Sequence, residues 1–297
     1  MSYDLHFYKS KTSDVTEENI TKFLSDCFSE KREHEHQWIF ESKETGAYFI
    51  VDKNTINGND DTEYEEEQFD GFEPTGFSFS LNFGRPDFFG TFAFRFIDRF
   101  IDSLGLYVYN PQIEEEPATP YIPEGDVLYN NWLEGNHQFI LQFFDKADLS
   151  YCQPEKTNYY FEHNSNIARL QEGLVEDAFV PSIFLLKRKN DGKIITATTW
   201  SEYIPNLFPI VDYYFLSKKR RKWFRPVWET SIMKADDFFD KFDSFLEDYG
   251  DAGYKIARSE KHPNLRNIFC SISFDSDLKN FAEGIAIEQI VNVRPGR

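Results

Sequence analysis

Positive charge and aromatic rings meet in one short run of the sequence, Lys218-Lys219-Arg220-Arg221-Lys222-Trp223-Phe224-Arg225. Cationic groups follow phosphates and aromatic rings stack on bases, so the run has the ingredients of a nucleic-acid contact. The net charge of −19 opposes approach to a polyanion, however, and disfavours nucleic acid as the partner. We expect this patch to form salt bridges with acidic residues of the chain or of a partner, or to remain solvated. The basic patch comprises Lys218, Lys219, Arg220, Arg221, Lys222 and Arg225, and a predicted hairpin could extend it with Lys187, Arg188, Lys189 and Lys193.

Acidic residues gather in two segments, which are the candidates for contact with a basic protein partner. They are Asp60, Asp61, Glu63, Glu65, Glu66, Glu67 and Asp70 in the first segment, and Glu114, Glu115 and Glu116 in the second. A calcium-binding EF-hand loop laid on residues 52–63 fails at two positions. Ile56 stands where an oxygen ligand is needed, and Asn57 stands where the sharp turn needs glycine. The acids therefore predict a charged surface loop and not a calcium site.

Residues for metal or thiol chemistry are sparse. His34 and His36 would share one face of an extended segment, but a zinc site needs three or four ligands and no third histidine lies at a supporting spacing. The three cysteines, Cys27, Cys152 and Cys270, form no Cys-x-x-Cys pair, and Cys27 is expected on the buried face of a helix. The sequence therefore predicts no metal, no cofactor and no disulfide framework, and it fits a reducing compartment.

The elements that would hold these residues form two parts. Residues 1–112 are expected to form an acidic α+β domain with the order strand, helix, three strands, helix, strand. Both helices should cover one face of an antiparallel or mixed sheet, as in ferredoxin-like folds. Thr16 is expected to cap the first helix, and the second should follow Asp87 and end at Gly105. The strands are expected at 3–8, 37–41, 47–52, 77–83 and 106–109.

Prolines and glutamates mark residues 113–124 as a linker or as an ordered strap on the surface. Residues 125–297 are expected to form a second α+β domain. The periodicity predicts helices at 127–144 and 158–174, hairpin strands at 183–186 and 194–200, a strand at 213–216, a helix from about Phe238 that ends at Gly250, and a late strand at 267–274.

Negative charge is concentrated in the first part of the chain. Residues 1–126 hold 27 acidic and 10 basic residues, a net charge of −17, whereas residues 127–297 hold 24 acidic and 22 basic residues. Such a field attracts basic proteins and repels nucleic acid and anionic lipid. No apolar run approaches the roughly 20 residues of a membrane-spanning helix, and no export signal is visible. We expect a cytoplasmic protein with no membrane contact.

Three stretches carry a resemblance to a group of proteins. They are the opening Met1-Ser2-Tyr3-Asp4-Leu5-His6-Phe7, residues 77–89 with Asn82-Phe83 and Arg85-Pro86, and Leu104-Gly105-Leu106 with Asn110-Pro111-Gln112. They resemble uncharacterised bacterial proteins, some of which are suspected immunity proteins of polymorphic toxin systems. The resemblance covers roughly the first 115 residues. It implies a cytosolic single-chain binder and offers no catalytic residue to carry over.

Two function classes follow, and a structural or scaffold protein of a larger complex is a third hypothesis that the sequence does not separate from the first. The sequence holds no glycine-rich phosphate loop, no kinase motifs and no serine-hydrolase elbow, so no catalytic residue is assigned. The favoured hypothesis is a non-catalytic cytosolic interaction protein of the immunity type, which neutralises a basic protein. The alternative is an enzyme with a site in a cleft between the two parts, with Arg85, Asp87, His163 and Glu202 as the polar residues to inspect first.

Overall fold

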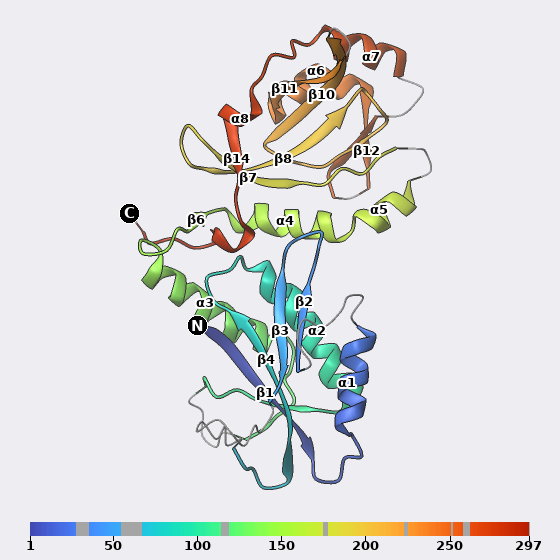
Figure 1. The fold of residues 1–297 in the computed structure, drawn as a ribbon. Coiled ribbons are helices and arrows are strands. Elements are labelled where there is room, and N and C mark those ends of the chain that lie inside the picture. The colour runs from blue at the N-terminus through green and yellow to red at the C-terminus, as the bar shows by residue number, and fades with distance from the viewer. Residues whose placement is uncertain are drawn as a thin grey trace. The chain divides into compact units, whose positions relative to one another are not determined.

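The chain folds into two compact units, shown in Figure 1. The computed structural model describes residues 1–27, 36–54, 67–113, 119–174, 178–222, 225–250, 252–257 and 262–296. The first unit comprises Met1–Ala147 and Val293–Arg297, and the second comprises Asp148–Asn292. Both units mix helices with sheets, which confirms the predicted α+β class.

The first unit is built on a five-stranded antiparallel sheet in the order β2-β3-β4-β1-β5. β1 lies between β4 and β5, as in the split βαβ arrangement of ferredoxin-like folds, and β2 adds an edge strand next to β3. The strands are β1 (Ser2–Ser10), β2 (Gln37–Glu41), β3 (Tyr48–Lys53), β4 (Phe72–Asn82) and β5 (Tyr107–Tyr109).

Helices α1 (Glu17–Asp26) and α2 (Phe88–Leu104) cover one face of this sheet, as predicted. Phe100 of α2 packs edge-on against Phe7 of β1 at 4.9 Å between ring centroids, and Phe96 packs on Phe49 of β3 at 5.1 Å. Phenylalanine therefore fills the core between the helices and the sheet. Thr16 caps α1 through a reciprocal hydrogen bond with Asn19, which confirms the predicted start of that helix.

Helix α3 (Val127–Phe143) packs against α2 and belongs to the first unit, although the sequence analysis placed it in the second part. A Cβ atom on Gly90 of α2 would lie 2.5 Å from the ring of Trp132, which is fully buried. The two helices can approach this closely because residue 90 has no side chain. The division between the units therefore follows Ala147 and does not lie at residues 113–124.

Residues 119–124, the described end of the predicted linker, include an ordered contact with the sheet. The backbone N–H of Tyr121 donates to the carbonyl of Val108 at 2.9 Å, and the N–H of Val108 donates back to Tyr121 at 2.8 Å. These bonds favour an ordered surface strap over a linker for this segment.

The second unit contains a mixed five-stranded sheet in the order β11-β10-β8-β7-β14, in which β8 and β10 run parallel. β9 pairs with β13 and β13 with β12 in a separate small sheet, while β6 and β15 form a parallel pair. Its strands are β6 (Ser150–Tyr151), β7 (Phe184–Arg188), β8 (Ile194–Ser201), β9 (Leu207–Phe208), β10 (Tyr213–Lys222), β11 (Arg225–Lys234), β12 (Leu246–Tyr249), β13 (Tyr254–Ala257), β14 (Ala282–Gly284) and β15 (Ile290–Val291).

The helices of the second unit differ from the predicted ones at several places. Its helices are α4 (Pro154–Ser165), α5 (Ile167–Gly173), α6 (Ala235–Phe242), α7 (His262–Ser271) and α8 (Leu278–Phe281), with short 3-10 turns at Asp243–Phe245 and Ile287–Gln289. The single helix predicted at 158–174 begins earlier and is interrupted at Asn166. The prediction of a late strand at 267–274 was wrong, because helix α7 occupies most of that segment. Its residues Leu265 and Phe269, which are four positions apart, are both buried.

The prediction of a helix that runs to Gly250 was also wrong. Helix α6 ends at Phe242, and β12 follows because it pairs with β13 as a hairpin. Gly250 and Gly253 take positive φ values of 62° and 73° in the connecting turn, a conformation that glycine adopts without strain. In the described part of the chain, no helix has the length and apolar character needed to cross a membrane.

Candidate functional site

The face of the first sheet opposite α1 and α2 is the candidate site, and we call it the open face. Side chains alternate between the two faces along a strand, so Leu5 and Val51 point to the buried helix side while Asp4, Glu41 and Asp52 point the other way. By register, the open face comprises Ser2, Asp4, His6, Gln37, Ile39, Glu41, Tyr48, Ile50, Asp52, Ser78, Ser80, Asn82 and Tyr109. These positions include three carboxylates and no Lys or Arg. Ser78 and Tyr109 are buried, and Phe69 packs on Tyr109 at 4.9 Å between ring centroids.

Hydrogen bonds hold two of the three carboxylates in place without neutralising their charge. Asp4 accepts from Ser80 Oγ at 2.6 Å and from Ser2 Oγ at 3.0 Å. Asp52 accepts from Gln37 Nε2 at 2.7 Å. Arg85 reaches the border of the face, where its Nη2 donates to Tyr48 Oη at 3.0 Å.

Glu67, one of the predicted contact residues, lies beside the open face. Its carboxylate accepts a hydrogen bond from Tyr109 Oη at 2.9 Å, and its backbone carbonyl accepts one from Tyr8 Oη at 2.9 Å. Burial lowers the pKa of His6, while the nearby carboxylates of Asp4 and Glu67 act in the opposite direction. His6 is therefore neutral at pH 7 and does not offset the negative charge of this face.

The other predicted acidic contacts are only partly placed. Asp70 is fully exposed, with Lys11 at 3.9 Å. Asp60, Asp61, Glu63, Glu65, Glu66, Glu114, Glu115 and Glu116 lie outside the described residues, as does His34.

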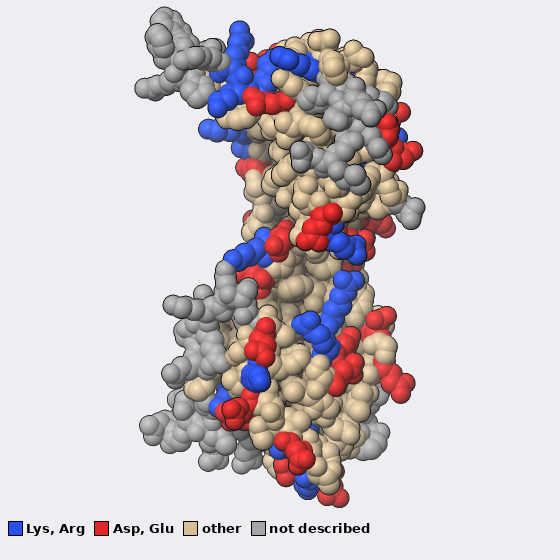
Figure 2. Space-filling model, turned by 90° about the vertical axis from the view of Figure 1, so that its right-hand side faces the viewer, with Lys and Arg blue, Asp and Glu red and all other residues tan. Residues whose placement is uncertain are grey.

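Charge on the rest of the surface is mixed where it can be seen. On the face drawn in Figure 2, Asp and Glu side chains are interspersed with Lys and Arg side chains, and they form no continuous acidic patch. Lys53, for example, pairs with Glu17 at 2.6 Å, and Lys9 pairs with Glu73 at 3.6 Å. The absence of cations from the open-face positions thus distinguishes them from these paired surface charges.

The basic patch lies on a two-stranded ribbon of the second unit. β10 pairs with β8 only over residues 213–217, so the rest of β10 extends past β8 with β11 alone as its partner. Lys218 Nζ lies 3.9 Å from the ring centroid of Phe274, and Arg220 pairs with Glu229 at 3.3 Å. Of these two contacts, the Arg220 pair is an intramolecular salt bridge of the expected kind, whereas Lys218 makes a cation–π contact. Lys219 belongs to the same stretch, and Arg221, Lys222 and Arg225 follow in the strands of the ribbon.

The hairpin basic residues do not extend this patch. β8 runs parallel to β10, so the turn before β8 lies at the opposite end of the sheet from the ribbon that follows residue 217. Arg188 in that hairpin is paired with Asp191. The suggested extension by Lys187, Arg188, Lys189 and Lys193 was therefore wrong.

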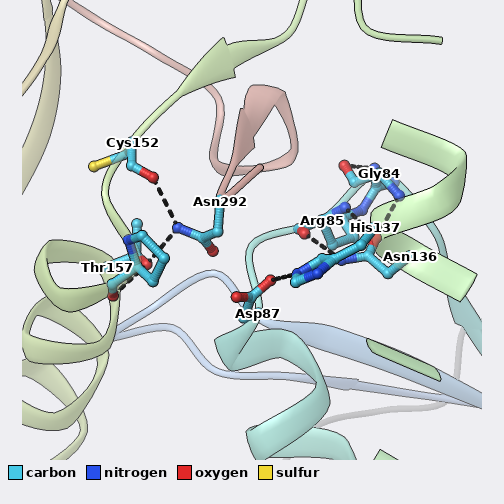
Figure 3. Close-up of polar contacts among 9 residues, drawn as sticks. Gly84, Arg85, Asp87, Asn136, His137, Cys152, Thr157 and Asn292 are labelled. Atoms are coloured by element: carbon cyan, nitrogen blue, oxygen red, sulfur yellow. Dashed lines mark hydrogen bonds and ion pairs between the residues drawn. The ribbon is translucent and has the colours of Figure 1, made fainter. Parts of the chain in front are cut away.

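The four residues of the enzyme alternative divide between the units. Arg85 and Asp87 belong to the first unit, where Asp87 Oδ1 lies 2.9 Å from Nε2 of His137 (Figure 3). The buried Asn136 amide accepts from the N–H of Gly84 at 2.8 Å and donates to the carbonyl of Arg85 at 2.9 Å. These bonds clamp the loop before α2 onto α3.

His163 and Glu202 belong to the second unit. His163 is buried, with Nε2 at 2.7 Å from the Pro181 carbonyl and Nδ1 at 3.1 Å from Tyr254 Oη. A carbonyl only accepts, so Nε2 carries the hydrogen and Nδ1 of the neutral ring accepts from Tyr254. Neither ring nitrogen is free to act as a base. Glu202 lies in a tight turn at φ 51° and accepts from the N–H of Lys219 at 3.3 Å.

Thiol and metal chemistry find no support in the described residues. Burial raises the pKa of the Cys152 thiol to about 11, which keeps it protonated and unreactive. Cys27 and Cys270 are exposed, so the expected burial of Cys27 was wrong: it follows the last turn of α1, where Arg99 Nη2 lies 3.7 Å from its sulfur. No group of three or more His, Cys, Asp or Glu side chains within the described ranges is placed to hold a metal ion.

Comparison with known proteins adds no further assignment, because no family model, no curated protein and no solved structure matches the chain. Asp4, Glu41 and Asp52 were not among the predicted contact residues, because each lies apart from the two acidic segments along the chain. A signal was present in β1, where apolar and polar residues alternate over residues 2–6. It was absent from β2 and β3, in which Ile39, Tyr48 and Ile50 are apolar residues at open-face positions.

Proposed function

We propose that the protein is a non-catalytic interaction protein of the immunity type, which binds and neutralises a basic protein through the open face of its first unit. The observation that carries this proposal is the set of carboxylates Asp4, Glu41 and Asp52 on a sheet face without Lys or Arg at its strand positions. The net charge of −17 on residues 1–126 supports it.

The physical basis is electrostatic steering. Complementary charge raises the association rate of two proteins and orients their encounter. The hydrogen bonds from Ser80 and Gln37 keep Asp4 and Asp52 in fixed positions, so a partner loses less entropy when it binds them. Ile39 and Ile50 are half-buried on the same face and are paired across β2 and β3. They offer the apolar contact that affinity requires.

The test uses the protein as bait in a lysate of its source cells, followed by purification of any retained protein. A basic partner should bind the wild type tightly at low salt and more weakly at high salt. The triple variant Asp4→Asn, Asp52→Asn, Glu67→Gln should then lower the association rate constant by about tenfold, because three charges next to the contact are removed.

The control removes the same number of charges from the helices of the same unit, with Glu18→Gln, Asp26→Asn and Asp102→Asn, all of which are exposed. It should change the rate constant about threefold or less. Equal losses in the two variants would place the contact elsewhere. A retained partner that is acidic, or whose affinity does not respond to salt, would contradict the proposal itself.

A further inference from the structure

The second unit contains a pocket of about 440 Å³ that has no part in the proposed function. It lies between the helices α4 and α5 on one side and the β12–β13 turn on the other. Its lining includes the rings of Tyr159, His163, Tyr249 and Tyr254 and the charged side chains of Glu162 and Arg169. Its volume is in the range of sites that bind small organic molecules.

Hydrogen bonds fix the rings that form the floor of this pocket. Tyr254 Oη donates to His163 Nδ1, and Tyr159 Oη accepts from the backbone N–H of Ile210 at 3.1 Å. The rings of Tyr159 and His163 are stacked, with an interplanar angle of 22° and centroids 6.4 Å apart. On the other side, Tyr249 Oη donates to the Gly173 carbonyl at 3.2 Å. Rings held in this way present planar surfaces before a ligand arrives, which favours a planar aromatic ligand.

Two opposite charges stand at the pocket's rim. Glu162 and Arg169 are both exposed and line the pocket, and both act electrostatically on the Tyr254 hydroxyl. Neither side chain forms an ion pair with another residue of the described part of the chain. A guanidinium binds carboxylate or phosphate through paired hydrogen bonds, and a carboxylate accepts from N–H groups.

We propose that this pocket binds a small planar aromatic ring that carries both an N–H donor and an anionic group. The ring stacks on the tyrosines, the anionic group pairs with Arg169, and the N–H group donates to Glu162. Two kinds of molecule share this chemistry, an indole carboxylate and a purine mononucleotide. The neutral His163 side chain is buried beside the pocket with both nitrogens bonded, so it supports the tyrosine rings and takes no proton from the ligand.

Titration calorimetry of the full chain with indole-3-acetate and with adenosine monophosphate tests the proposal and distinguishes the two sources. At least one should bind in the micromolar range. The neutral counterparts indole and adenosine should bind at least fivefold more weakly, because they lack the group that pairs with Arg169. Absence of binding by both anionic probes at millimolar concentration would overturn the proposal, as would equal affinity for the charged and neutral members of each pair.

Two variants locate the site. Arg169→Ala should weaken binding of the anionic probe at least tenfold, while leaving the affinity for its neutral counterpart within twofold. Ala252→Trp adds a large side chain at an exposed residue of the pocket lining and should abolish binding of both. Lys193→Ala, which removes an exposed charge from the β7–β8 hairpin, is the matched control and should bind like the wild type. Binding that survives Ala252→Trp, in a variant whose circular dichroism spectrum is unchanged, would place the ligand elsewhere. None of these variants touches the open face, so failure here is independent of the proposed function.

Discussion

His163 illustrates how a residue of catalytic type can be committed to structure. Tyr254 donates to one ring nitrogen and the Pro181 carbonyl accepts from the other, in an environment that leaves the side chain 1% exposed. Such a buried, fully bonded polar group specifies one arrangement of its surroundings. The sequence could suggest His163 as a polar residue to inspect, but its two partners lie 18 and 91 positions away along the chain. No local pattern relates residues so far apart.

Burial lowers the pKa of His163 below the ordinary value of 6.5, so the stability of the fold should depend on pH near that value. As the pH falls below about 6.5, the His163 ring becomes protonated in the unfolded chain, whereas in the folded chain it stays neutral until a lower pH. The free energy of unfolding therefore decreases. Above about 6.5 both states hold a neutral ring and this contribution is constant.

In urea denaturation between about pH 7.5 and pH 5, His163→Gln should show a shallower loss of stability than the wild type, by about 1.4 kcal/mol for each unit of pKa depression. The exposed His36 provides the control: His36→Gln should retain the wild-type slope. A slope in His163→Gln equal to that of the wild type would show that the buried ring does not resist protonation.

At the scale of elements, the sequence predicted the first unit far better than the second. Apolar and polar residues alternate in β1 up to Phe7 and in residues 77–82 of β4, and Thr16 and Gly105 mark helix ends through local chemistry, so these elements were predictable. The structure of the segment from Phe238 to Tyr249 was not predictable in this way. Its aromatic residues fit a helical stripe equally well, but pairing with β13 converts Leu246–Tyr249 into a strand. Tertiary pairing overrides local periodicity in such short segments.

The contact between α2 and α3 offers a sharp test at this scale. Gly90→Ala places a methyl group 2.5 Å from atoms of the Trp132 ring and 2.9 Å from Tyr129, so the helices must move apart. We expect a loss of about 2 kcal/mol in the free energy of unfolding, although alanine favours a helix more than glycine does. Urea denaturation measures this value. Gly284→Ala is the control, because nothing lies within 4 Å of the added atom, and it should change stability by less than about 0.5 kcal/mol. A neutral or stabilising Gly90→Ala would mean that the two helices do not pack as closely as described.

For the whole molecule, the dominant feature is the charge of −19. Composition reveals the total and its uneven distribution along the chain, but not the face on which the carboxylates gather. That placement depends on strand register, which a single sequence leaves open until the strands are paired. The boundary between the units could not be predicted from the sequence for a similar reason. The prolines and glutamates of residues 113–124 are typical of a linker, yet α3 beyond them completes the core of the first unit.

Like charges at this density repel one another in the compact state, so added salt should stabilise the protein at neutral pH. We expect NaCl at about 0.3 M to raise the unfolding temperature by roughly 2–4 °C over its value at low salt, which corresponds to about 1 kcal/mol. Differential scanning calorimetry measures this shift. Close to the isoelectric point of about 4.7 the net charge vanishes, and the same addition of salt should have little effect. An equal response at both pH values would assign the stabilisation to general salting-out rather than to screening.

The pairing of β6 with β15 has a consequence for how such a chain could have arisen. Ser150 lies opposite Ile290, and Asn292 bonds back to the carbonyl of Cys152 at 3.0 Å and to Thr157 Oγ1 at 2.8 Å (Figure 3), so the second unit starts and finishes at one place. A segment whose ends meet can be spliced into a host gene at a single point, or removed from it, while each fold keeps its own core. The chain thus has the topology of an inserted module, residues 148–292, that is flanked on both sides along the sequence by residues of the first unit.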